Sequence, residues 1–100
     1  MDDTTLGGYQ QVHGRPPAFG AADGQAYSVA TFTDDVAADR RFGAALLFVR
    51  WDEAARPVGH LETDYLAFGA TPDEALALVL ALTLEQVKGH LDRCVERQRA

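Results

Sequence analysis

The stretch from Thr71 to Arg97 constrains the fold of this chain more than any other part of the sequence. Thr71 is a suitable N-cap, Pro72 stands at the first helical position, and Glu74 completes a capping box three residues after the cap. Asp73 and Glu74 also place negative charge at the positive end of the helix dipole. These agreeing signals predict a helix that begins at Pro72.

Apolar residues recur along this helix with the 3.6-residue period of one buried face. Thr83 and Gln86 also form a capping-box pattern, which favours a break near Thr83. The unbroken apolar stripe favours continuity instead, and it predicts one long C-terminal helix packed on the chain's own sheet. The stripe consists of Leu76, Leu80, Leu84, Val87, Leu91 and Val95.

The first half of this helix is apolar on more than one face. Leu78, Val79 and Leu82 point away from the stripe, and a helix that is apolar on all sides is buried on all sides. We therefore predict that these three residues form the interface of a homodimer. The alternative is that the N-terminal arm of the same chain covers them.

Composition bounds the class of protein. One hundred residues make one domain, and a hydrophobic content of 47% excludes a wholly disordered chain. The net charge of −6 argues against nucleic acid as a partner. The single cysteine, Cys94, rules out an intrachain disulfide and suits a reducing compartment. Without a signal peptide or a membrane-length apolar run, the expected location is the cytoplasm.

Two regions differ in character along the chain. Residues 1–25 are rich in glycine and contain Pro16-Pro17, which predicts a partly ordered N-terminal arm. Residues 26–97 are predicted to form a single α+β domain.

Alternating apolar residues predict three strands within that domain, at 26–33, 44–51 and 58–68. The order of three strands and then one helix predicts a three-stranded antiparallel sheet with the helix on one face, in two layers. So thin a fold leaves an apolar face and strand edges exposed, and pairing with a second chain would cover both.

The junction Gly69-Ala70-Thr71-Pro72-Asp73-Glu74-Ala75-Leu76 resembles that of the HicB-like domains, whose sheet also ends in a glycine, a threonine cap and a Glu-Ala pair. The resemblance covers roughly residues 26–91. It implies a small dimeric domain, and the best-known members neutralise an RNA-cleaving toxin. Residues 60–66 lack the Pro- and Gly-containing turn of that family, and no DNA-binding module follows Val95. The resemblance therefore implies an antitoxin-like or regulatory role with a small protein partner, without operator binding.

A row of possible metal ligands lies in the third predicted strand. His60, Glu62 and Asp64 alternate, so in a strand they share one face, and imidazole with carboxylates can bind a metal. The alternative is that they form the solvated side of the strand, with Leu61, Thr63 and Tyr65 turned inward.

Cys94 follows His90 by one helical turn, which suggests a thiol nucleophile with a histidine base. A nucleophile also needs a partner that orients the base, so a packed, unreactive thiol is the simpler interpretation. No catalytic residue and no cofactor is predicted. We predict a non-catalytic homodimeric domain that acts through protein–protein contacts. The alternatives are a metal- or small-ligand-binding protein or hydrolase that uses His60, Glu62 and Asp64, and a structural domain with no partner beyond itself.

Overall fold

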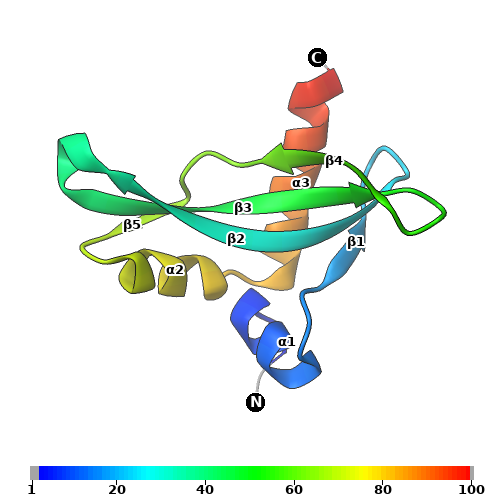
Figure 1. The fold of residues 1–100 in the computed structure, drawn as a ribbon. Coiled ribbons are helices and arrows are strands. Elements are labelled where there is room, and N and C mark those ends of the chain that lie inside the picture. The colour runs from blue at the N-terminus through cyan, green and yellow to red at the C-terminus, as the bar shows by residue number, and fades with distance from the viewer. Residues whose placement is uncertain (1–2, 100) are drawn as a thin grey trace.

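The computed structural model describes residues 3–99, in which five antiparallel strands form one sheet and three α-helices lie against it. Figure 1 shows α1 and α2 below the sheet and α3 behind it. The α+β class and the antiparallel sheet are confirmed. The elements are α1 (Leu6–His13), β1 (Ala18–Gly20), β2 (Ala26–Val36), the 3-10 helix η1 (Ala37–Asp39), β3 (Arg41–Trp51), β4 (Pro57–Glu62), β5 (Ala67–Gly69), α2 (Pro72–Leu80) and α3 (Leu84–Arg99).

Strands β2 and β3 form the centre of the sheet and pair along their whole length, from Ala26–Trp51 to Val36–Arg41. The short β1 pairs only with the start of β2. On its other side, β3 pairs with β4 along one half and with β5 along the other. The two central strands therefore support every other part of the sheet.

The core lies between one face of the sheet and the helices. Alternate side chains of β2 and β3 point into it because successive residues of a strand face opposite sides. It also holds Leu6 from α1, so the N-terminal segment is part of the same core. The buried residues of the strands, α2 and α3 are Tyr27, Val29, Ala44, Leu46, Phe48, Ala75, Val79, Val87, Leu91, Cys94 and Val95.

The sheet differs from the prediction because the third predicted strand is interrupted, and because β1 was not predicted. Glu62 pairs with Leu47, whereas Ala67 pairs with Ala44, at the position that an unbroken ladder would give to Tyr65. The chain thus inserts two extra residues between β4 and β5. The prediction of three strands is wrong for this reason.

The connection between β4 and β5 is fixed by contacts on both sides of the sheet. Thr63 turns inward, and its hydroxyl oxygen accepts a hydrogen bond from the Leu46 N–H at 3.0 Å. Tyr65 crosses to the opposite face, where its hydroxyl donates to the Asp34 carboxylate at 2.7 Å. A Cβ on Gly43 would lie 2.7 Å from the Tyr65 ring, so glycine permits this packing. An inward position for Tyr65 is therefore wrong.

The single long C-terminal helix is also wrong, because α2 ends at Leu80 and α3 begins at Leu84. The Thr83 hydroxyl oxygen accepts from the Gln86 N–H at 3.1 Å, and the Gln86 side-chain oxygen accepts from the Thr83 N–H at 2.9 Å. Both halves of a capping box are present. The local sequence signal for a break outweighs the continuous apolar stripe.

The N-terminal segment pairs with the backbone at this break. The Leu6 N–H donates to the Leu82 carbonyl at 2.8 Å, and the Leu84 N–H donates to the Thr4 carbonyl at 2.8 Å. Leu6 is fully buried. Residues 1–25, predicted as an arm, thus contain α1 and β1, with residues 1 and 2 outside the described part.

The break changes which side of α2 faces the core. Ala75 and Val79 are fully buried, whereas Leu76 and Leu80 of the predicted stripe are only half-buried. The predicted stripe is not buried as one continuous face, because α3 begins a new helix at the Thr83 cap and its rotation is independent of that of α2. No helix in residues 3–99 is both long and apolar enough to cross a membrane.

Replacing the cap of α3 tests this account of the break. The Thr83→Ala variant should lose about 1 kcal/mol of unfolding free energy, because one N–H of the first turn loses its partner. Urea denaturation followed by circular dichroism measures the loss. Thr83→Ser retains the hydroxyl and should keep most of the stability. Equal stability of the Ala variant and the unmutated chain would contradict the capping role.

Candidate functional site

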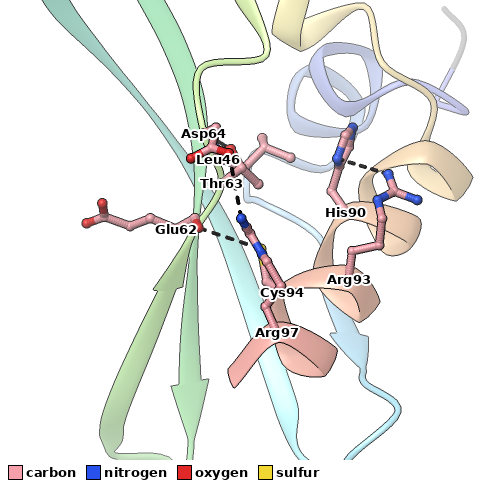
Figure 2. Close-up of polar contacts among 8 residues, drawn as sticks. All are labelled: Leu46, Glu62, Thr63, Asp64, His90, Arg93, Cys94 and Arg97. Carbon is pink, nitrogen blue, oxygen red and sulfur yellow. Dashed lines mark hydrogen bonds and ion pairs between the residues drawn. The ribbon is translucent and has the colours of Figure 1, made fainter. Parts of the chain in front are cut away.

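A cleft of about 420 Å³ lies between α3 and the connection from β4 to β5. Its volume falls within the range of small-molecule sites, roughly 300–1,000 Å³. Figure 2 shows the side chains that meet there. The lining residues are Thr63, Asp64 and Leu66 from the connection, and His90, Arg93, Cys94, Glu96 and Arg97 from α3.

One side of α3 supplies most of the polar groups of the cleft. His90, Arg93, Cys94 and Arg97 follow at spacings of three and four residues, so they lie along one side of a helix. Val87 and Leu91 are fully buried and fix the rotation of α3 against the sheet. Core packing therefore directs this polar side toward the β4–β5 connection.

Cys94 forms part of the inner wall and is only 4% exposed. Its thiol donates to the Glu62 carbonyl at 3.6 Å and accepts from the Arg97 guanidinium at 3.6 Å. Hydrogen bonds to sulfur are weak. The thiol is a packed group, as the simpler interpretation of the sequence has it.

His90 interacts with Arg93 and not with the thiol. The Arg93 guanidinium lies 3.0 Å from His90 Nδ1. Because a guanidinium only donates, Nδ1 is the acceptor, and the imidazole is neutral with its proton on Nε2. Partial burial, and then the positive charge of Arg93, lower the pKa of His90. The cleft therefore holds an uncharged histidine beside a permanent cation.

Arg97 crosses the mouth of the cleft from α3 toward Asp64 (Figure 2). The nitrogen–oxygen distance to Asp64 is 3.6 Å, and the two side chains are 59% and 94% exposed. An ion pair so exposed to solvent contributes little, about 0–1 kcal/mol. The hydrogen bond to the Cys94 sulfur, and then the Asp64 carboxylate, raise the pKa of Arg97. Arg97 is thus permanently charged, and its ion pair with Asp64 is weak enough for another anion to take the place of Asp64.

The predicted row of metal ligands is not formed as one row. His60 Nε2 lies 3.8 Å from the Glu62 carboxylate, and both side chains are exposed. Asp64 stands beyond the end of β4 and faces Arg97, because the chain leaves the strand after Glu62. Among residues 3–99, no group of three or more His, Cys, Asp or Glu side chains is arranged to hold a metal ion.

The three residues predicted as a dimer interface do not share one exposed face. Leu78 is 56% exposed and Leu82 is half-buried, whereas Val79 is fully buried in the chain's own core. The core that contains Val79 also contains Leu6 of α1. Val79 therefore has no surface to offer a second copy.

A second surface, here called the open face, lies on the side of the sheet opposite the core. Side chains at alternate positions of β3 point to it, and none of the helices described here covers it. Trp51 lies on it, and its indole N–H donates to the Ser28 hydroxyl at 2.9 Å. The apolar residues of the open face are Ala30, Phe32, Leu47, Val49, Trp51, Tyr65 and Phe68.

Polar groups border the open face. Register pairs His60 with Val49 and Glu62 with Leu47, so these two polar side chains flank the apolar centre. The sequence signal for this surface is the second predicted strand, which is apolar at both odd and even positions. One set packs into the core, and the other set is left on the open face.

No protein-family model, curated protein or solved structure matches this chain. The open face and the cleft are therefore interpreted from their own geometry and chemistry.

The lowered pKa of His90 predicts how stability depends on pH. An unfolded chain binds a proton at His90 near the ordinary pKa of 6.5, whereas the folded chain binds it only at lower pH. The unfolding free energy should therefore be complete above about pH 6.5 and should decrease as the pH falls below it. In urea denaturation at successive pH values, His90→Gln should lose this component of the decrease.

The matched control is His60→Gln, which changes an exposed histidine of β4 and should retain that component. If His90→Gln has the same pH dependence as the unmutated chain, the assignment of a neutral, partly buried His90 is wrong.

Proposed function

We propose that this chain acts without catalysis, as a homodimer that forms through the open face of its sheet. One observation carries the proposal: Leu47, Val49 and Trp51 are apolar and remain half-buried on a face that no described helix covers. Contiguous exposed apolar patches mark interaction sites, and tryptophan is enriched among the residues that dominate binding energy.

The arrangement of groups on the open face suits burial against protein. Its apolar centre has a polar border, formed in part by His60 and Glu62, as protein interfaces have. The Trp51 N–H already has its acceptor, Ser28, within the chain. Covering the ring would therefore leave no unpaired donor, a condition that buried tryptophans normally meet.

A second copy is the occupant that the layer structure favours. The domain has two layers, with helices on one face of the sheet only. Two sheets pack well face to face at a separation of about 10 Å, and a two-fold axis brings the same surface from both copies together. Such a dimer buries the open faces of both chains at once. The interface is thus proposed on the sheet instead of on Leu78, Val79 and Leu82.

The resemblance to the HicB-like domains suggests what the dimer would do, namely bind a small protein in an antitoxin-like or regulatory role. The support is limited to the strand-to-helix junction. Gly69 there has a packing reason of its own, since a Cβ would lie 2.7 Å from the Ala75 nitrogen. A small toxin-like reading frame beside the gene would support this role.

A charge on the open face tests the dimer. Val49→Asp should weaken self-association by on the order of 100-fold or more, because an unpaired carboxylate would be buried in the interface. Sedimentation velocity at micromolar concentration should show a two-chain particle for the unmutated chain and a monomer for the variant. Circular dichroism checks that the variant remains folded.

Leu78→Asp is the matched control, because Leu78 is 56% exposed on α2, away from the open face. It should remain a dimer. A monomeric unmutated chain would show the proposal to be wrong, and dissociation of Leu78→Asp alone would move the interface to α2.

A further inference from the structure

We propose that the cleft between α3 and the β4–β5 connection binds a small organic monocarboxylate with an apolar body. Its carboxylate would accept hydrogen bonds from Arg97, with Arg93 as the second positive charge, and its apolar body would pack on Leu66 and Cys94. The cleft lies on the helix side of the sheet, so this inference does not depend on the dimer proposed at the open face.

The lining of the cleft combines apolar surface with a few polar groups, as small-molecule sites do. Leu66 and the packed thiol of Cys94 are among its walls. The buried Thr63 holds one wall, since its hydroxyl and its N–H both bond to the backbone of Leu46 at 3.0 Å. The cleft is therefore bounded by a helix and by an anchored connection.

Arg97 has partners that match its donors poorly. A guanidinium presents five N–H groups in a planar fork that fits a carboxylate with two parallel hydrogen bonds. In this structure its contacts are a thiol sulfur and the Asp64 carboxylate, each at 3.6 Å. Asp64 is 94% exposed, so a ligand carboxylate can replace it with little loss.

The remaining charges of the cleft favour a ligand with a single negative charge. Arg93 adds a second cation, and the neutral His90 beside it adds none. Asp64 and Glu96 also line the cleft. These two carboxylates would repel a dianion such as a phosphate monoester more strongly than a monocarboxylate. The balance of charges therefore favours an acid with one carboxylate.

Titration with sodium phenylacetate, followed in ¹H–¹⁵N correlation spectra of the full chain, tests the proposal. Phenylacetate should cause saturable shifts at the amides of residues 63–66 and 90–97. The neutral analogue phenylacetamide has nearly the same shape and should cause no saturable shifts there, since the proposed recognition depends on charge.

Substitutions then identify the groups that bind. Arg97→Gln should weaken binding about tenfold, because a charge-assisted pair of hydrogen bonds is lost. Asp64→Asn should strengthen it about two- to fivefold, since it removes the competing carboxylate. Arg40→Gln makes the same charge change in the turn before β3 and should leave the affinity within about twofold.

Three results would overturn the proposal. The first is the absence of saturable shifts up to about 10 mM phenylacetate, since binding weaker than this would have no functional role. The second is an equal response to phenylacetamide, and the third is an equal affinity of Arg97→Gln and Arg40→Gln for phenylacetate. Dispersed spectra confirm that each variant is folded. Phenylacetate should bind the Val49→Asp variant as it binds the unmutated chain, so failure of the cleft proposal and failure of the dimer proposal are distinguishable.

Discussion

The reciprocal hydrogen bonds between Thr83 and Gln86 are the interaction on which the rest of this structure depends. They begin α3 and leave a short link after α2, which pairs with the N-terminal residues through a bridge between Thr5 and Thr83. Two separate helices can each pack their own apolar side on the sheet in a different direction. One continuous straight helix could pack on it in a single direction only. The direction of α3 and the inclusion of Leu6 in the core both follow from this break.

The second determining feature is the interruption of the edge of the sheet after Glu62, between β4 and β5. The two extra residues point to opposite sides of the sheet. Asp64 reaches Arg97 on the helix side, whereas Tyr65 packs over Gly43 on the open face. One irregularity thus contributes to both surfaces for which a role is proposed, a common use of irregularities at sheet edges.

The two surfaces differ in the chemistry they offer. The open face has a broad apolar centre and a polar border, which suits contact with another protein. The cleft, of about 420 Å³, brings together two arginines of a chain whose net charge is −6. Opposite sides of the sheet therefore serve the two proposals, and neither role requires the other.

The sequence by itself determined the α+β class, the central strands around 26–33 and 44–51, and the capped start of α2 at Thr71, because hydrogen bonds and periodicity over a few residues decide these features. It also contained the cap at Thr83, but a local cap and an apolar stripe gave opposite predictions there. Only the tertiary structure decided between them, since the Leu6–Leu82 and Thr4–Leu84 backbone bonds come from residues far apart in the chain.

The same reason explains the candidate sites. The row of His60, Glu62 and Asp64 assumed an unbroken strand, and the interface on Val79 assumed an uncovered helix; long-range packing removed both conditions. The apolar character of both faces of β3 could be read from its sequence. The meeting of Arg97 with Asp64 could not, because these residues are far apart in the chain and meet only through the docking of α3 against the β4–β5 connection.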